Sequence, residues 1–147
     1  MDRFSEQAAD EFLAAFPEWR RFARSEQCDD GSSSFVLEIS PPVEAAVEHG
    51  LVVYTDNEEI TVGLDFYHSH FDSMVGDGEH FGTTAAVEFV RQVVGERLAV
   101  VSWWLNEEWV GSAQIEAGTQ PDAQFMKPYN RIRVRSWKGT FNADICV

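Results

Sequence analysis

The chain has 147 residues, of which 44% are hydrophobic and 13% aromatic, so it can bury a core without the help of a disulfide or a metal. It carries 25 acidic residues against 11 basic ones, a net charge of −14, which disfavours binding to the phosphates of nucleic acids. No apolar run approaches the roughly 20 residues that a membrane span needs, and the acidic start of the chain is unlike a signal peptide, so we expect a cytoplasmic protein with no membrane partner.

The first part of the chain is predicted to be helical. Apolar residues recur at steps of three or four between Phe4 and Ala15, and Pro17 suits the first turn of a second short helix that continues to Arg24. A turn-forming stretch follows, and a further short helical turn is expected within residues 43–50. The next strands are predicted to form an antiparallel group with a hairpin turn at 55–58, and they span residues 35–39, 51–54 and 59–66.

The second part of the chain is predicted to contain one helix and several strands. A loop rich in His, Asp and Gly covers residues 68–82, and a helix capped by Thr83 or Thr84 ends near Gly95. The remaining strands are expected at 98–105, 109–116, 131–137 and, as an edge strand, within 140–147. Since strands come in hairpins, we predict one α+β domain over residues 1–147, with a mostly antiparallel sheet, N-terminal helices and one central helix packed on the sheet.

The acidic charge is concentrated in the middle of the chain. Residues 25–124 hold nineteen acidic and two basic residues, a net charge of −17, whereas residues 125–147 have a net charge of +4. A segment this negative favours a basic partner and would speed the association with it. The alternative is that the charge only keeps the protein soluble.

The two cysteines, Cys28 and Cys146, lie near opposite ends of the chain. Neither has a second cysteine beside it, so the pair carries no zinc-site or C-x-x-C signal. We expect two free thiols in a reducing compartment, with a bridge between the two ends as the alternative.

Histidines gather in one short segment. In an extended chain His68 and His70 project to the same face at a separation that suits one metal ion, and Asp72 or His80 could supply a third ligand. The order of these residues resembles the first part of the metallo-β-lactamase signature, but that pattern needs a histidine where this chain has Ser73. Two other interpretations compete with a metal: the imidazoles continue the inward face of the preceding strand, or they belong to a polar surface loop. We predict no metal and no cofactor.

A second cluster places three tryptophans around a tight turn that carries Glu107 and Glu108. Neighbouring residues on a strand point to opposite faces, so Trp103 and Trp104 cannot both enter one core layer. One of them is expected to reach the other face, where it meets solvent or a partner. The alternative is that all three rings, including Trp109, are buried.

Three arginines, Arg131, Arg133 and Arg135, share one side of a predicted strand. Like charges in a row are unfavourable unless anions lie opposite them. We expect carboxylates of the preceding hairpin to supply them: Glu107, Glu108 or Glu116. A bound phosphate is the alternative, although no Gly-rich phosphate loop accompanies the arginines.

The segment Glu59-Ile-Thr-Val-Gly-Leu-Asp-Phe-Tyr-His-Ser-His-Phe-Asp72 resembles one that recurs in small bacterial proteins of toxin–immunity loci, which are similar in length, acidity and α+β pattern. The resemblance is clearest over residues 51–72 and extends weakly through the Trp-rich hairpin. It implies a cytosolic immunity protein, not an enzyme, that neutralises a cognate protein toxin by plugging its active site or docking beside it. Many such toxins are basic nucleases, which would suit the acidic middle segment.

On this hypothesis, carboxylates pair with basic groups of the toxin and two tryptophans serve as anchors. The predicted partner-binding residues are Asp56, Glu58, Glu59, Asp72, Asp77, Glu79, Trp104, Glu107, Glu108 and Trp109. The alternative, a small metal-dependent hydrolase, would use His68, His70, Asp72 and His80. The sequence leaves a homodimer open.

Overall fold

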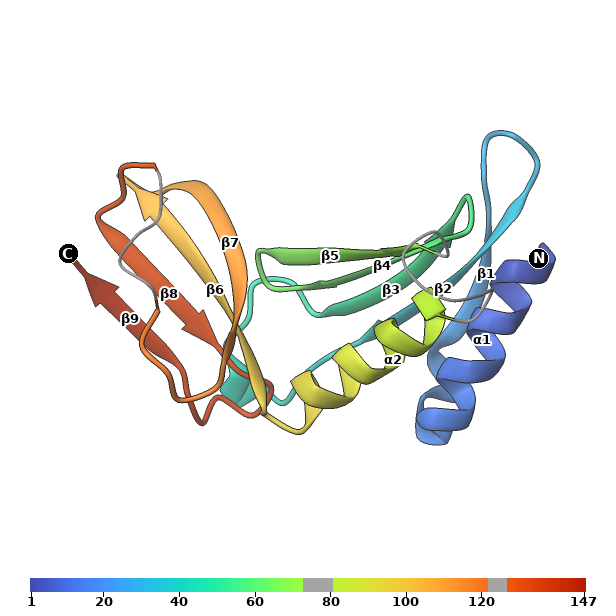
Figure 1. The fold of residues 1–147 in the computed structure, drawn as a ribbon, viewed down its shortest axis with the longest axis horizontal. Coiled ribbons are helices and arrows are strands. Elements are labelled where there is room, and N and C mark those ends of the chain that lie inside the picture. Colours follow the sequence, from blue (N-terminus) through green and yellow to red (C-terminus); the bar gives the residue numbers. More distant parts are fainter. Residues whose placement is uncertain (73–80, 122–126) are drawn as a thin grey trace. The chain divides into compact units, whose positions relative to one another are not determined.

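The computed structural model in Figure 1 describes residues 1–72, 81–121 and 127–147. Within these ranges the chain forms nine strands in two antiparallel sheets together with helices, which confirms the α+β class. The chain divides into two units: unit 1 comprises 1–40, 50–63 and 68–91, and unit 2 comprises 41–49, 64–67 and 92–147. That residues 1–147 form a single domain stays a prediction, because a division into two compact units does not test it.

Unit 1 is built on a five-stranded sheet, here called sheet 1. Its strands lie in chain order, each beside the next, as a series of hairpins. They are β1 (Ala23–Gln27), β2 (Ser33–Ile39), β3 (Leu51–Asp56), β4 (Glu59–Leu64) and β5 (Tyr67–Asp72).

Helix α1 (Arg3–Ala15) packs on one face of sheet 1. The carboxylate of Asp2 caps it by accepting a 2.7 Å hydrogen bond from the backbone N–H of Ser5. The ring of Phe12 lies 6.3 Å from that of Phe35, measured between centroids, and the Ser5 hydroxyl lies 2.6 Å from that of Thr55. These contacts join the apolar side of α1 to β2 and β3.

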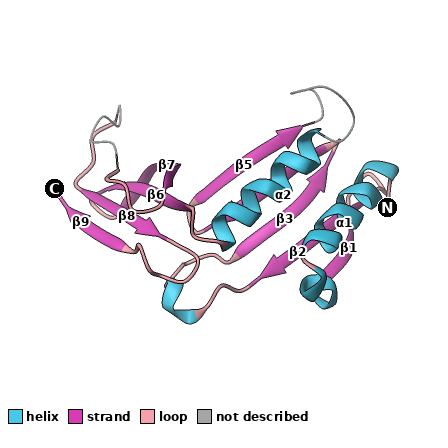
Figure 2. Ribbon diagram, turned by 60° about the horizontal axis from the view of Figure 1, so that its bottom comes forward, coloured by secondary structure: helices cyan, strands magenta, loops and turns pink. Residues whose placement is uncertain are grey.

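Helix α2 (Phe81–Val94) lies on the same face of sheet 1 as α1, as Figure 2 shows. The ring of Phe89 is 5.7 Å from that of Phe71 on β5. The side chains of sheet 1 that point to the helices are mostly buried and apolar: Phe35, Leu37, Leu51, Val53, Ile60 and Val62. The core of unit 1 therefore lies between the two helices and one face of the sheet.

Unit 2 is built on a four-stranded sheet, here called sheet 2, with the order β7-β6-β8-β9. Its strands are β6 (Leu98–Leu105), β7 (Glu108–Glu116), β8 (Arg131–Arg135) and β9 (Ala143–Cys146). One face carries a cluster of buried apolar residues: Ala99, Val101, Trp103, Ile132 and Val134. The other face carries the arginines of β8. Arg133 and Arg135 donate to the carbonyl of Ala46, in segment 41–49, which contains the short 3-10 helix η2 (Val43–Ala45).

Several predicted boundaries differ from the structure. The second helix was expected to reach Arg24, but the 3-10 helix η1 (Pro17–Phe22) ends earlier and β1 begins at Ala23. The predicted loop 68–82 is wrong at both ends, because residues up to Asp72 form β5 and α2 begins at Phe81. Thr83 and Thr84 therefore lie inside the helix and not at its cap, and the predicted strand 59–66 ends at Leu64. Both edge strands have polar sequences that lack a clear alternation, and pairing with a neighbouring strand decides their conformation.

Both cysteines, Cys28 and Cys146, are free thiols. Across the described ranges, helices fall short of the length and apolar character needed to span a membrane.

Candidate protein-binding face

The face of sheet 1 opposite the helices, here called the open face, is formed by side chains in register across neighbouring strands. Arg24, Val36, Tyr54 and Thr61 are aligned partners on β1, β2, β3 and β4. Partners aligned in this way leave the sheet on the same side. The hydroxyl of Thr61 lies 3.0 Å from Nδ1 of His70, which extends the row to β5.

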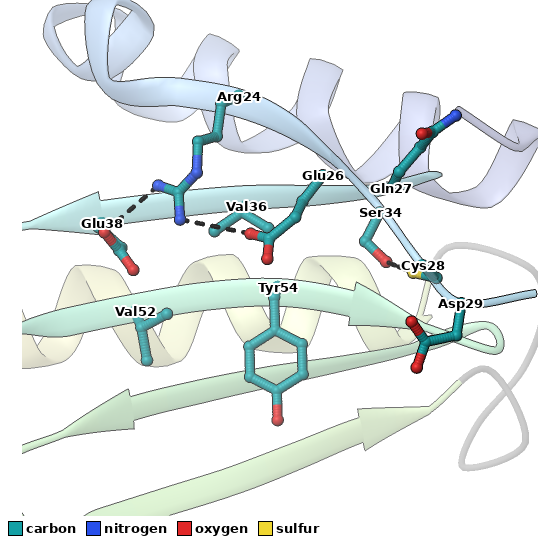
Figure 3. A pocket seen from close by; sticks show the side chains of 10 residues that line it. All are labelled: Arg24, Glu26, Gln27, Cys28, Asp29, Ser34, Val36, Glu38, Val52 and Tyr54. Carbon is teal, nitrogen blue, oxygen red and sulfur yellow. Dashed lines mark hydrogen bonds and ion pairs between the residues drawn. The ribbon is translucent and has the colours of Figure 1, made fainter. Parts of the chain in front are cut away.

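A hollow of about 530 Å³ lies on the open face over β1, β2 and β3 (Figure 3). Its apolar residues are Val36, which is 7% exposed, Val52, and Tyr54, which is 37% exposed. Polar and charged residues surround them: Arg24, Glu26, Gln27, Cys28, Asp29, Ser34 and Glu38. An apolar centre with a polar rim is the usual anatomy of a protein-binding surface.

Arg24 bridges two carboxylates at the rim of the hollow, as Figure 3 shows. Its Nη1 lies 3.3 Å from Oε2 of Glu38, and its Nη2 lies 3.4 Å from Oε2 of Glu26. The hydrogen bond to Glu38 is the main cause that raises the pKa of Arg24 above its usual value. The three side chains are 46%, 61% and 60% exposed for Arg24, Glu26 and Glu38, so water surrounds these contacts and each is weak.

The turn between β1 and β2 shapes one end of the hollow. The Cys28 thiol lies 3.1 Å from the Ser34 hydroxyl, and the Cys28 N–H donates to the Ser32 carbonyl at 2.8 Å. The hydroxyl and the N–H of Ser32 both donate to the carboxylate of Asp30, and these bonds lower the pKa of Asp30. Gly31 completes the turn with a φ of 86°, a left-handed conformation that glycine adopts without strain.

Three predicted partner-binding carboxylates lie together at the β3–β4 hairpin. Asp56 and Glu59 are aligned partners, and the turn between them consists of Asn57 and Glu58 with φ values of 47° and 62°. Asp56 and Glu58 are exposed, and Glu59 is half-buried. Positive φ values at both central residues define a type I′ hairpin turn, in which the second position favours glycine. In this chain Glu58 occupies that position.

The prediction that His68 and His70 share one face is confirmed. Both side chains are exposed on β5, and their ring centroids are 5.1 Å apart. Nδ1 of His70 also lies 2.7 Å from Oε1 of Glu59, which orients its ring. The interpretation that these imidazoles continue the inward face of the preceding strand is wrong, because β4 ends at Leu64 and a turn at Asp65 starts a new strand.

In the part of the chain that the structure describes, no group of three or more His, Cys, Asp or Glu residues is placed to hold a metal ion. Asp72 is half-buried at the end of β5. Three predicted site residues lie outside the described residues: Asp77, Glu79 and His80.

The tryptophan hairpin belongs to unit 2, where its rings occupy different environments. Trp103 is 4% exposed in the core, whereas Trp109 is 48% exposed. Trp104 is half-buried on the opposite face from Trp103, with its ring 4.7 Å from that of Phe66 and its Nε1 donating to the Ser102 hydroxyl at 2.9 Å. The prediction that Trp103 and Trp104 face opposite sides is confirmed, and the alternative in which all three rings are buried is wrong for Trp109.

The turn of this hairpin repeats the geometry of the β3–β4 turn. Asn106 and Glu107 have φ values of 49° and 70°, and both Glu107 and Glu108 are exposed. Asn130 holds the turn: its Nδ2 donates to Oδ1 of Asn106 at 3.0 Å, and its Oδ1 accepts from the Asn106 N–H at 3.1 Å. The predicted carboxylates therefore stand on an ordered turn.

The three arginines of β8 pair with carboxylates of the protein. Arg131 and Arg135 each place an Nη2 3.0 Å from an oxygen of Asp144 on β9. Arg133 binds Asp65 through Nε at 2.9 Å and Nη2 at 3.2 Å. Burial alone would raise the pKa of Asp144, but the hydrogen bonds and charges of the two arginines outweigh it and lower this pKa.

The expected partners of the arginines, Glu107, Glu108 and Glu116, are wrong for a topological reason. β8 lies between β6 and β9, so β6 separates it from β7, which carries Glu108 and Glu116 and follows the turn that contains Glu107. A phosphate bound by the arginine row, the alternative, would have to displace the carboxylates of Asp65 and Asp144, which already bind these guanidinium groups.

The hollow was not predicted from the sequence. The helical pattern places Arg24 in a helix, and Glu26 and Glu38 enter the sequence-based prediction only through the charge of segment 25–124. A signal was present, because Arg24 and Glu26 alternate before a turn-forming stretch and Glu38 lies on the strand that follows it. Such a pattern of opposite charges is typical of a hairpin with cross-strand pairs.

The chain matches no protein-family model, and neither a curated protein nor a solved structure matches it significantly.

Proposed function

We propose that this is a cytosolic immunity-type protein, not an enzyme, which binds a basic protein toxin through the open face of sheet 1 and so neutralises it. The observation that carries the proposal is the hollow on that face. Val36, Val52 and Tyr54 offer an apolar centre, and the described residues that line the hollow include three carboxylates and one guanidinium. A partner that matches this surface has basic side chains around an apolar anchor.

The surrounding charge supports the same kind of partner. The carboxylates of Asp56, Glu58 and Glu59 lie at the end of β3 and β4, on the sheet that carries the hollow. They belong to a segment with a net charge of −17, so a cationic protein would be attracted over a long range and would associate faster at low ionic strength.

The two glutamates in left-handed turns also support a role for exposed carboxylates. Glu58 and Glu107 each occupy the turn position at which glycine is least strained. Residues with a strained backbone cluster at functional sites, so these two glutamates are candidates for contact with a partner. The hairpin with Glu107, Glu108 and Trp109 is a second predicted contact for the toxin.

Co-expression tests the function. The probe is the C-terminal domain of the protein encoded directly upstream of this chain, expressed in a bacterial host with and without the chain. We expect the domain to stop growth alone, the chain to restore growth, and the two purified proteins to form a stoichiometric complex. A harmless upstream domain, or growth that stays arrested, would contradict the proposal.

Charge reversal then locates the contact. We expect Glu26→Lys with Glu38→Lys to slow association at least about tenfold at low salt, because the reversed groups repel the toxin. The matched control is Glu6→Lys with Glu18→Lys, which makes the same change of charge at exposed positions on α1 and η1. The pair Glu107→Lys and Glu108→Lys tests the second contact in the same assay. Equal rates for the hollow variant and the control would place the contact elsewhere.

A small metal-dependent hydrolase is the second candidate. The neighbouring rings of His68 and His70 favour it, because both are exposed and Glu59 orients one of them. Elemental analysis of the purified protein tests it. Stoichiometric zinc that is lost in His70→Ala would support the hydrolase, and metal-free protein would count against it.

A further inference from the structure

Arg24 occupies the place on the open face where a cationic partner would be expected to bind. Its guanidinium lies between the carboxylates of Glu26 and Glu38, beside Val36 (Figure 3). The register sets this position, since Arg24 is aligned with Val36 and Val36 with Tyr54. The protein thus binds a guanidinium of its own at the rim of the hollow.

The contacts of Arg24 are of a kind that can be exchanged. Both ion contacts are single-point, at 3.3 and 3.4 Å, and each side chain of the trio is roughly half exposed or more. The pair in unit 2 between Arg133 and Asp65 differs in both respects, because it has two hydrogen bonds and side chains that are 11% and 2% exposed. Exposed single-point ion pairs contribute little free energy, so a competing cation can replace Arg24 at the two carboxylates.

The hollow suits a guanidinium better than an ammonium group. An arginine is planar, binds two carboxylates at once and stacks on aromatic rings, whereas a lysine is a compact, strongly hydrated charge. The ring of Tyr54 is 37% exposed within the hollow and is available for such stacking. Arg24 already bridges the two carboxylates of the rim through its two Nη atoms, and the guanidinium of a partner can form the same two contacts.

We propose that Arg24 is an internal competitor, which keeps Glu26 and Glu38 in position in the free protein and yields them to an arginine of the partner. This inference rests on the proposed function and names the chemistry of the partner: an exposed arginine that enters the hollow over Tyr54. Arg24 then sharpens specificity, because a partner that binds both carboxylates and the ring displaces it more readily than a cation that binds one carboxylate.

Peptide binding to the purified full chain tests the inference. The probes are hexa-arginine and hexa-lysine peptides with blocked ends, titrated by calorimetry at low ionic strength. We expect Arg24→Gln to bind hexa-arginine about three- to tenfold more tightly than the wild type, the range set by the loss of two exposed ion contacts. Arg24→Lys, which keeps the positive charge, should bind hexa-arginine as weakly as the wild type does. Tyr54→Ala should reduce the preference for hexa-arginine over hexa-lysine.

Arg91→Gln is the matched control. It removes the same single charge from an exposed pair, since Nη1 of Arg91 lies 3.5 Å from Oε2 of Glu88 on α2. A general effect of net charge would strengthen peptide binding equally in both variants, and this result would overturn the inference. Weaker binding by Arg24→Gln would also overturn it, because Arg24 would then contribute to the binding surface.

Nuclear magnetic resonance supplies a second measurement on the wild type. We expect the Nε–Hε signal of Arg24 to move toward the position of a solvated arginine as hexa-arginine is added, while the signal of Arg91 stays in place. A signal of Arg24 that does not move at saturation would contradict displacement. If the chain neutralises a toxin but the peptide and resonance effects are absent, the role of Arg24 is rejected and the proposed function stands. If the peptides bind as expected but no toxin is neutralised, the proposed function is rejected and the role of Arg24 stands.

Discussion

Asp65 and Arg133 form a two-point ion pair that joins two parts of unit 2 distant in sequence. Nε and Nη2 of Arg133 donate to the two oxygens of Asp65 at 2.9 and 3.2 Å. The carboxylate also accepts a 2.7 Å bond from the N–H of Glu48, and Nη2 of Arg133 donates to the carbonyl of Ala46 at 2.8 Å. The pair therefore holds segment 41–49 against β8.

The first prediction is that Arg133→Met lowers the free energy of unfolding by about 3 kcal/mol, because it leaves the buried carboxylate of Asp65 without its partner. Urea unfolding followed by tryptophan fluorescence measures this in unit 2, which contains four of the five tryptophans. Arg91→Met, at an exposed pair, should change the same quantity by less than about 0.5 kcal/mol. Similar effects of the two substitutions would contradict a structural role for the pair.

A second prediction concerns two glycines with left-handed φ. Gly139 has a φ of 78°, and a Cβ there would collide with the carbonyl of Glu44, whereas Gly31 has a φ of 86° and open space around it. Gly31→Ala should lower the free energy of unfolding by roughly 1 kcal/mol through backbone strain alone. Gly139→Ala should lower it by roughly 2 kcal/mol or more, because the collision adds to the strain. Equal losses in urea unfolding would show that segment 41–49 moves aside freely.

The third prediction is a pH dependence from Asp144. Arg131 and Arg135 hold its pKa in the folded protein below the unfolded value of about 3.9. A lowered pKa contributes stability above the unfolded pKa, and this contribution is lost as the pH falls through the folded pKa. Asp144→Asn should therefore be less stable than the wild type at pH 7, and the difference should vanish under strongly acidic conditions. A difference that stays constant with pH would show that the charge of Asp144 is not responsible.

A fourth prediction follows from the strained turns. Glu58→Gly should raise the free energy of unfolding by about 0.5–1 kcal/mol, because glycine adopts the φ of 62° without the penalty of a side chain. Glu58→Ala removes the same carboxylate but keeps the strain, so its stability should stay near that of the wild type. If both variants lose stability equally, the carboxylate itself stabilises the turn.

Several elements were predictable because their signals are local. The apolar spacing of α1, the strand at β4 and the Asn-Glu turns of both hairpins have signals within a few consecutive residues, and the structure confirms these elements. The opposite orientations of Trp103 and Trp104 followed from strand geometry alone.

The hollow was not predictable in the same way. It depends on Arg24 lying beside Val36, and this alignment requires β1 to pair with β2 rather than to continue the helix before it. The partners of the β8 arginines could not be predicted from local sequence either, because they depend on the strand order. That order places β9 beside β8, and β6 between β8 and β7.

The amino-acid sequence by itself determined the α+β class, the hairpins and the acidity of the middle segment, because composition, periodicity and turn residues act over short distances along the chain. Tertiary structure decided which charges meet. Strand order and register bring Arg24 to Glu38 and Arg133 to Asp65, and pairing between distant strands is selected by the burial of whole sheet faces, which no single segment encodes.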